Sequence, residues 1–204
     1  NKFLELNNIS KTFETSKKLK VIKNLSYNFK KGKIYSLMGP SGSGKSTLLN
    51  LISLIDKPSN GLIKFNKHQI NYDDKEQNDQ LRAKKIGIVY QQNNLLPDFT
   101  SLENIYLASL SINNNKNLAI SKAKQLLQKI GLSSRADHYP SQLSGGEAQR
   151  IAIARAIIND PEIILADEPT GSLDMKTAKI IFNLLKDQKR SDRLIIFATH
   201  NRFF

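Results

Sequence analysis

A glycine-rich loop between two apolar segments constrains the fold of this chain more than any other feature. The loop fits the pattern G-x4-G-K-[ST] and consists of Gly39, Pro40, Ser41, Gly42, Ser43, Gly44, Lys45, Ser46 and Thr47. The apolar run 34–38 before it predicts a buried strand, and residues 46–55 after it predict an apolar helix. A strand, a glycine loop and a buried helix form half of a parallel α/β unit. We therefore predict a phosphate-binding loop in an α/β fold, because flexible Gly/Ser linkers do not lie between buried elements.

The chemistry of such a loop follows from its backbone. Consecutive N–H groups point at the phosphates, and the start of the helix adds a favourable partial charge. Glycines are needed because a Cβ would block that approach. In this pattern Lys45 reaches the β- and γ-phosphates, and the Ser46 hydroxyl ligates Mg²⁺.

The remaining elements are predicted from apolar periodicity and turn residues. Further strands are expected at residues 3–9, 21–29, 86–90, 163–166 and 194–198, and helices at 118–130 (with Gly131 after its end), 147–158 and 177–185. Residues 71–80 predict a loop or a frayed helix, and residues 113–117 a polar loop. The strands flank a helical segment at about 95–158, which indicates an inserted subdomain.

Two acids end the apolar run 163–166. A carboxylate at the tip of a strand beside a phosphate-binding loop can hold the water shell of Mg²⁺, which is the role predicted for Asp167. Glu168 would then polarise the attacking water. His200 follows the strand 194–198 and is placed to contact the γ-phosphate, and Gln91 follows the strand 86–90. Without the loop, each of these residues would be typical of an ordinary strand end.

A second glycine-containing helix start follows Leu143 and consists of Ser144, Gly145, Gly146 and Glu147. Its serine and its free N–H groups make a second anion-binding position. One interpretation is that it serves the γ-phosphate of a partner's ATP. Taken alone, the pattern indicates no more than a well-capped helix.

Composition narrows the class of protein. The net charge is +13, but the basic residues are mostly lysines, which favours a solvated lysine surface over specific recognition of nucleic acid. The chain has no cysteine, so it has no disulfide and no thiolate zinc site. No apolar run approaches the 18 residues of a membrane span, and the beginning of the chain lacks the pattern of a secretory signal.

Taken together, these motifs resemble the nucleotide-binding subunit of ABC transporters over nearly the whole chain. Residues 39–47 resemble the Walker A motif, 143–147 the signature motif and 163–168 Walker B with its catalytic glutamate. Gln91 resembles the Q-loop glutamine, residues 172–174 the D-loop with Asp174, and His200 the H-loop. Phe13 occupies the place of the aromatic residue that stacks on adenine.

The resemblance implies a single ABC ATPase domain with a P-loop NTPase (RecA-like) core, an N-terminal antiparallel β-subdomain and an inserted α-helical subdomain. Residues 1–94 and 159–204 would form the core and the β-subdomain, and residues 95–158 the helical subdomain. The family usually continues by a further strand and helix, so we expect this chain to end before the domain does. ATP and Mg²⁺ are the implied cofactors, with Ser46, Gln91 and Asp167 as candidate metal ligands and Glu168, His200, Gln91 and Lys45 as candidate catalytic residues.

The resemblance also implies partners. Two copies would form a head-to-tail homodimer through two shared ATP molecules. Each ATP would lie on residues 144–147 of one copy and on six residues of the other, namely Lys45, Ser46, Gln91, Asp167, Glu168 and His200. A separate transmembrane permease would dock near Gln91 and residues 92–105, at the cytoplasmic face of the membrane. Residues 90–91, 95–100 and 102–104 resemble lipoprotein-releasing ATPases and macrolide exporters, so lipoprotein release or a related export is expected.

Two alternatives remain open. A non-transport ABC ATPase that acts on DNA or ribosomes is slightly favoured by the basic charge, but such proteins usually add coiled coils, zinc modules or a second cassette. A regulatory adaptor that binds nucleotide without hydrolysis is disfavoured by Glu168 and His200.

Overall fold

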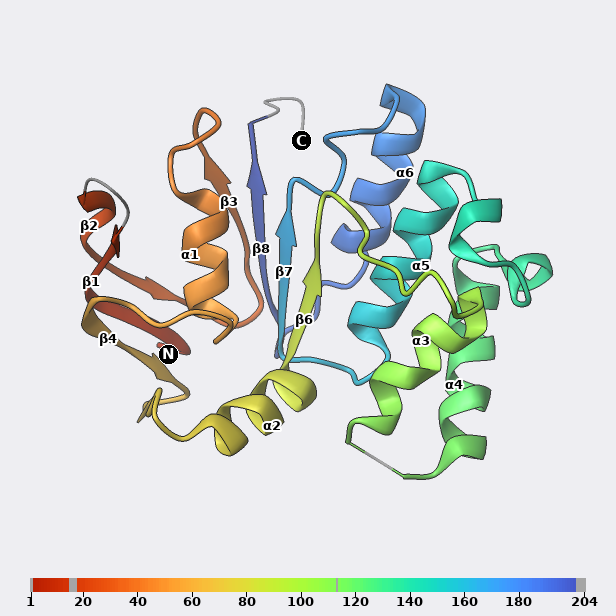
Figure 1. Cartoon of the computed structure of the whole chain (residues 1–204), viewed down its shortest axis with the longest axis horizontal. Helices are drawn as coiled ribbons and strands as arrows, with labels where there is room; N and C mark the ends of the chain where they lie inside the picture. Colours follow the sequence, from red (N-terminus) through yellow and green to blue (C-terminus); the bar gives the residue numbers. More distant parts are fainter. Residues whose placement is uncertain (1, 15–17, 113, 201–204) are drawn as a thin grey trace.

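The computed structural model describes residues 2–14, 18–112 and 114–200, which form two β-sheets, six α-helices and two short 3-10 turns (Figure 1). The strands are β1 (Leu4–Glu14), β2 (Lys18–Phe29), β3 (Ile34–Met38), β4 (Asn60–Phe65), β5 (His68–Gln69), β6 (Ile86–Val89), β7 (Ile163–Asp167) and β8 (Leu194–Thr199). The helices are α1 (Lys45–Ile52), α2 (Lys75–Lys85), α3 (Ser101–Leu110), α4 (Lys116–Lys129), α5 (Gly145–Ile157) and α6 (Met175–Lys186), and the turns are η1 (Ser133–Arg135) and η2 (Pro140–Gln142).

The central sheet is parallel, with strand order β3-β8-β7-β6. Its two inner strands, β7 and β8, are buried along almost their whole length. Near-continuous apolar runs of this kind are typical of parallel strands that are covered on both faces. The strands end at Met38, Val89, Asp167 and Thr199, all at the upper edge of the sheet in Figure 1. This edge therefore brings together residues that lie far apart in the sequence.

The second sheet is antiparallel, with strand order β2-β1-β4-β5. Helix α1 lies between the two sheets (Figure 1), and its buried leucines and isoleucine share one hydrophobic core with residues of both. Leu51 and Ile52 of α1 are fully buried there, together with Leu4 of β1 and Ile163 of β7. The helix that follows the glycine loop is thus held on two sides.

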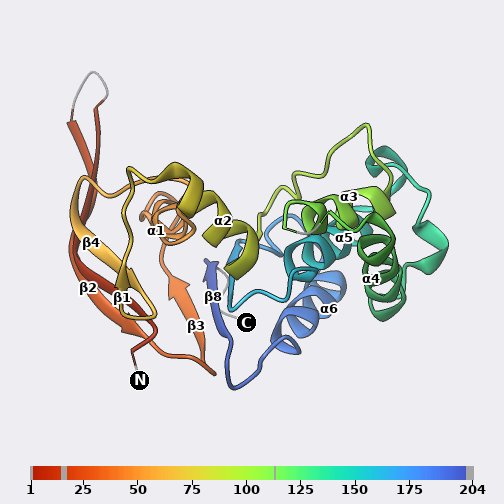
Figure 2. The ribbon, with the colours of Figure 1, turned by 90° about the horizontal axis from the view of Figure 1, so that it is seen from below.

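Helices cover the opposite face of the parallel sheet. Helices α5 and α6 pack there against β6, β7 and β8. Helices α3 and α4 form a second core with the other side of α5, farther from the sheet (Figure 2). Helix α5 therefore belongs to two cores at once: Ile153 faces the sheet, and Ile151 faces α3 and α4. The predicted fold class, a P-loop NTPase core with an antiparallel β-subdomain and a helical subdomain, is confirmed.

The compact apolar strands were predicted to within one residue at each end. Strands β3, β6, β7 and β8 match the predicted ranges, whereas β1 and β2 extend beyond residues 3–9 and 21–29. Helix α4 begins two residues earlier than predicted because the Asn115 side chain accepts a hydrogen bond from the N–H of Leu118. Gly131 follows its end at φ +71°, as expected for a helix stop. Residue 113 of the predicted loop 113–117 lies outside the described residues.

Other predictions were wrong or incomplete. Of residues 71–80, for which a loop or a frayed helix was predicted, 75–80 belong to α2. Asp74 caps this helix by accepting from the N–H of Gln77, and the helix buries only Asn78. Helix α1 ends at Ile52 instead of residue 55, since Leu54 adopts φ +62°. Strand β4 and helix α3 were not predicted as separate elements. No helix among the described residues has both the length and the apolar character needed to cross a bilayer.

Candidate active site

The glycine loop connects the upper end of β3 to α1. Gly44 occupies the N-cap of α1 at φ +90°, a conformation that L side chains rarely adopt. Within the described chain, no side chain caps this helix and its first turn carries no acid. The first N–H groups of α1 are therefore available to an external acceptor, which is the property that binds phosphate.

Lys45 is held over the loop from which it projects. Its Nζ donates to the carbonyl oxygens of Gly39 at 2.8 Å and Pro40 at 3.0 Å. Glu168 Oε1 lies 3.6 Å from the same nitrogen, and the lysine side chain is only 10% exposed. The ammonium group thus lies at the loop, beside the carboxylate of Glu168, the residue that directly follows β7.

Asp167 is the last residue of β7 and lies beside the loop. Burial raises the pKa of its carboxyl group, and the neighbouring Ser46 side chain opposes that rise. Its Oδ1 is buried without a hydrogen-bond partner among the described residues. A buried carboxylate oxygen in need of a partner, next to a hydroxyl, suits a hard divalent cation such as Mg²⁺. Ser46 and Asp167 therefore fit the predicted metal site.

Glu168 is placed between two basic groups. Its Oε2 accepts from the backbone N–H of His200 at 3.3 Å and lies 2.9 Å from His200 Nδ1, while Oε1 faces Lys45. The Glu168 backbone has φ +45°, in the left-handed region, and its N–H donates to Ala198 O at 2.8 Å. The ends of β7 and β8 thus direct this carboxylate toward the loop.

One pocket of about 710 Å³ collects most of the predicted residues. Its lining consists of Phe13, Leu19, Val21, Pro40, Ser41, Gly42, Gly44, Lys45, Ser46, Thr47, Gln91, Glu168 and His200. This volume lies in the range of small-molecule and cofactor sites. Leu19 and Val21 were not predicted. Leu19 reaches the pocket because it pairs with Phe13 across the β1–β2 ladder.

Two predicted residues of the loop lie at the edge of this arrangement. Ser43 lines a neighbouring pocket rather than this one. Gly39, the first residue of the loop, packs against Ser43: a Cβ added to it would come within 2.8 Å of Ser43 Oγ. Both stay close to the loop without lining the main pocket.

The second helix start lies elsewhere. Ser144, Gly145, Gly146 and Asp174 line a separate pocket of about 320 Å³ at the starts of α5 and α6. In the described chain, this pocket and the loop pocket share no lining residue. One copy of the chain therefore does not bring its two glycine-rich helix starts to a single ligand.

Both helices at this second pocket have capped ends. Ser144 Oγ accepts from the N–H of Glu147 at 3.2 Å, and Glu147 Oε2 accepts from the N–H of Ser144 at 2.8 Å. The hydrogen bond from the Ser144 backbone, followed by that from Arg135, lowers the pKa of Glu147 to about 2. Asp174 caps α6 by accepting from the N–H groups of Lys176 and Thr177, each at 3.0 Å.

An uncapped helix start after a parallel strand, with a lysine, a serine and two acids converging on it, defines a P-loop nucleoside triphosphatase. The family model described as "ABC transporter" matches residues 22–171 of the 204, and the chain belongs to this family. It is an ATP-binding subunit of that family and an ATPase.

Its curated relatives cover nearly the whole chain. The "Lipoprotein-releasing system ATP-binding protein LolD" of Rickettsia bellii is 43% identical over 205 residues, which are 98% of this chain and 90% of that protein. The protein of the same name from Ehrlichia canis is 44% identical over 199 residues, 97% of this chain and 88% of that protein. These names support the transport interpretation, and the DNA- or ribosome-acting alternative is not supported.

Solved structures of ATP-binding cassettes are similar to this chain in both fold and sequence. A dimeric structure of a post-hydrolysis state of the ATP-binding cassette MJ0796, bound to ADP and Pi, is 40% identical, with a TM-score of 0.89 over 97% of this chain and 88% of that chain. CbiO1 from Clostridium perfringens, part of the ABC transporter complex CbiONQ, is 27% identical with a TM-score of 0.83 over 98% of this chain and 80% of that chain.

Proposed function

We propose that this chain hydrolyses ATP in a head-to-tail dimer and thereby drives a separate membrane subunit, with lipoprotein release as the transport reaction. The observation that carries the proposal is the convergence of Lys45, Glu168 and His200 on an uncapped helix start. The names of the relatives supply the cargo class.

In this proposal the phosphates lie on the backbone N–H groups of residues 39–47, and Lys45 turns from the carbonyls of Gly39 and Pro40 to the β- and γ-phosphates. The exchange is favourable because the ammonium then faces a phosphate anion, which adds Coulomb attraction that two neutral carbonyls do not supply. Phe13, which lines the same pocket, would stack on the adenine.

Ser46, Asp167 and Gln91 would hold Mg²⁺. The Oδ1 of Asp167 supports this: it is buried without a hydrogen-bond partner in the part of the chain that the structure describes, and a cation would satisfy it. Bound there, the metal neutralises charge on the phosphate oxygens. Gln91 lines the pocket from the end of β6 and lies against Gly171, where an added Cβ would approach its Nε2 to 2.8 Å.

Glu168 would accept the proton of the attacking water. Its Oε1 lies 3.6 Å from Lys45 Nζ and its Oε2 2.9 Å from His200 Nδ1, so the carboxylate is held at the pocket that the loop lines. His200 orients the water and the γ-phosphate. The backbone N–H of His200 holds the carboxylate at the end of β7, so the base keeps its direction.

The second copy would complete each site. Ser144, Gly145, Gly146, Glu147 and Asp174 would contact the ATP bound to the partner's loop, an isologous arrangement in which each copy gives and receives the same contacts. Two observations support it: Ser144, Gly145, Gly146 and Asp174 line a pocket separate from the loop pocket, and MJ0796 is dimeric.

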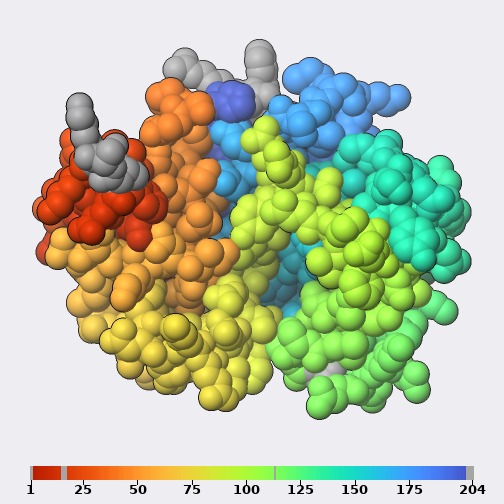
Figure 3. Space-filling view, in the orientation of Figure 1, coloured from red at the N-terminus to blue at the C-terminus, as the bar shows by residue number. Residues whose placement is uncertain are grey.

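The membrane subunit would dock near Gln91 and residues 92–105, on the cytoplasmic face of the membrane. The surface in Figure 3 is hollowed between α2, in yellow, and α3, in green, beneath the segment that follows β6. We further propose residues 1–94 and 159–204 as core and β-subdomain, and 95–158 as the helical subdomain. Asn159 donates to Ala83 O at 3.1 Å and to Ala108 O at 2.8 Å, which is what a residue at such a boundary would do.

The test is reconstitution. The chain and its co-purifying membrane subunit are placed in vesicles that carry a labelled lipoprotein, with a soluble acceptor outside. We expect ATP and Mg²⁺ to release the lipoprotein, and the variant Lys45→Ala to abolish release. ATP turnover without release would overturn the cargo while leaving the ATPase intact.

A further inference from the structure

Lys11 places its ammonium group against the aromatic ring of Phe13. Its Nζ lies 5.0 Å from the ring centroid, which is close enough for a cation–π contact. Phe13 lines the loop pocket, whereas Lys11 is not among the residues that line it. The lysine is 9% exposed and the phenylalanine 37% exposed. The ring is therefore backed by a buried cation and remains open toward the pocket.

The segment that follows α1 holds the ammonium group in this position. Lys11 Nζ donates to Asp56 Oδ1 at 2.6 Å and to the carbonyl of Lys57 at 2.9 Å. The backbone between the lysine and the ring is held as well: the N–H of Thr12 donates to Ser59 Oγ at 3.0 Å, and the Ser59 hydroxyl donates to the carbonyl of Thr12 at 3.3 Å. This segment thus fixes both the cation and the strand that carries the ring.

Helix α1 connects the anchor of Lys11 to the phosphate-binding loop. The loop leads into the first turn of α1, and Asp56 follows the end of the same helix. The helix has 8 residues, which corresponds to roughly 12 Å along its axis. It is packed in the core that the two sheets share. One rigid element therefore sets the distance between the loop and the support of the Phe13 ring.

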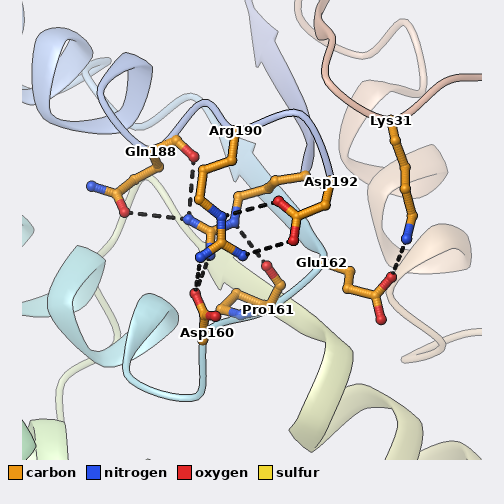
Figure 4. Close-up of polar contacts among 8 residues, drawn as sticks. Lys31, Asp160, Pro161, Glu162, Gln188, Arg190 and Asp192 are labelled. Atoms are coloured by element: carbon orange, nitrogen blue, oxygen red, sulfur yellow. Dashed lines mark hydrogen bonds and ion pairs between the residues drawn. The ribbon is translucent and has the colours of Figure 1, made fainter.

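A second lysine makes the same two kinds of contact around a buried ring. Lys31 Nζ lies 4.4 Å from the centroid of the Phe3 ring and 2.6 Å from Glu162 Oε2 (Figure 4 shows the ion pair). Phe3 is only 2% exposed, and the ring of Phe65 packs against it with 4.9 Å between centroids. Within the described chain, no second ring packs against Phe13. The arrangement at Phe13 thus has room for a flat partner that the arrangement at Phe3 already contains.

We infer that Lys11 is a positioning residue for recognition of the nucleotide base and that it acts through the ring of Phe13. The inference rests on the proposed function, in which Phe13 stacks on adenine. A cation on one side of an aromatic ring draws electron density from it, which lowers the repulsion between the ring and a purine stacked on its other side. The anchored cation also holds the ring in place, so less conformational freedom is lost when the purine binds.

The test separates the adenine base from the phosphates. Lys11→Met removes the charge but keeps an apolar side chain, and Lys11→Arg keeps the charge. Calorimetry measures the affinity of each dilute monomer for ATP and for inorganic tripolyphosphate, which can bind the loop but has no purine. The matched control is Lys31→Met, because it removes a cation–π contact and an ion pair from a ring outside the loop pocket.

We expect Lys11→Met to weaken ATP binding by about three- to tenfold and to leave the affinity for tripolyphosphate within about twofold of the parent. The KM for ATP should rise while kcat stays within about twofold, since stacking on adenine is the same before and during the reaction. Lys11→Arg should recover part of the ATP affinity, and Lys31→Met should change neither affinity. Equal losses for ATP and tripolyphosphate, or no loss for either, would overturn the inference. A parent that does not bind ATP would instead refute the proposed function.

Asp56→Asn tests the same inference if Lys11→Met does not fold. It keeps the shape of the side chain but removes the charge that anchors the ammonium group, so ATP affinity should fall while tripolyphosphate affinity does not. In a Phe13→Ala background, removing either Lys11 or the Asp56 charge should change ATP affinity by less than about twofold, because the lysine acts through the ring. Unchanged ATP affinity in Asp56→Asn, or the same loss with and without the ring, would contradict the role assigned to Lys11.

Discussion

Helices α1 and α5 both begin after glycine-containing segments, yet the chain satisfies their first N–H groups differently. At α1 the N-cap is Gly44, and within the described chain no side chain accepts from the first turn. At α5 the Ser144 hydroxyl and the Glu147 carboxylate form a reciprocal capping box, and Arg135 holds Glu147 through an ion pair at 2.9 Å. One helix start is open to a ligand, and the other is already closed by its own residues.

This difference between α1 and α5 indicates which of the two helix starts binds ATP first. An uncapped start gains all of its hydrogen bonds from the phosphate, whereas a capped start gains only those that remain. We therefore expect ATP to bind α1 of one copy alone, and the capped α5 of the partner to join only an ATP that is already bound.

The largest effect on ATP hydrolysis is expected for Glu168, at the site where α1 of one copy and α5 of its partner should contact the same ATP. Glu168→Gln keeps the shape and hydrogen bonds of the side chain but cannot accept the proton of water, so hydrolysis should slow by about 10²–10⁴-fold with ATP affinity preserved. ATP should then persist between the two starts and hold the dimer. Phosphate release and light scattering measure the two outcomes; hydrolysis at the parent rate would show that Glu168 is not the base.

The open start is tested by Lys45→Ala. Removing its charged hydrogen bonds to phosphate should weaken ATP binding by about one to two orders of magnitude, with an unchanged fold. Calorimetric titration measures the affinity and circular dichroism the fold. Lys124→Ala, an exposed lysine on α4, is the matched control and should bind ATP normally. Equal affinity in the two variants would remove Lys45 from the site.

The capped start is tested by Ser144→Arg. The bulky cation should leave the affinity of the monomer for ATP unchanged, because Ser144 lies outside the loop pocket, but weaken ATP-driven dimerisation by about tenfold or more in the Glu168→Gln background. Ser121→Arg, on the exposed face of α4, controls for the added charge. Loss of ATP affinity in the Ser144→Arg monomer would contradict the assignment of this start to the partner's ATP.

The smallest effect concerns the cap itself. The pKa of Glu147 is lowered from 4.5 to about 2 in the folded chain, chiefly by the Ser144 backbone N–H and then by Arg135. Its stabilisation is therefore complete above about pH 4.5 and is lost as the pH falls toward 2. Urea unfolding at pH 7 and pH 3 should show a smaller loss of stability for Glu147→Gln than for the parent. Glu76→Gln, in the first turn of α2, should behave like the parent.

The predictable parts of the fold are those in which burial alone dictates the pattern. Strands β7 and β8 are covered on both faces, so uninterrupted apolar runs marked them clearly. Helix α2 was predicted only as a loop or a frayed helix at residues 71–80, because it has no apolar stripe and depends on its Asp74 cap. Helix α3 was missed although Thr100 and Glu103 form a capping box that spacing could have revealed.

The residues of the site likewise include some that the sequence predicts and some that it does not. Residues 39–47, Glu168 and His200 were predictable because strand ends and a glycine loop carry them to one edge of the sheet. Leu19 and Val21 reach the pocket only through the pairing of β1 with β2, and Lys11 meets Asp56 only because the fold brings β1 to the end of α1. Such contacts depend on tertiary structure, which local patterns do not encode.

The left-handed backbone conformation of Glu168 lowers the folding stability at a residue that the proposed ATP hydrolysis requires. A side chain at φ +45° costs about 1–2 kcal/mol relative to a favourable conformation, and glycine would avoid most of that cost. A Glu168→Gly chain should therefore resist denaturant better than the parent while losing the proton acceptor. Selection of this protein for heat resistance alone would therefore favour glycine at position 168. The selected variants would be stable and would bind ATP, but they could not hydrolyse it.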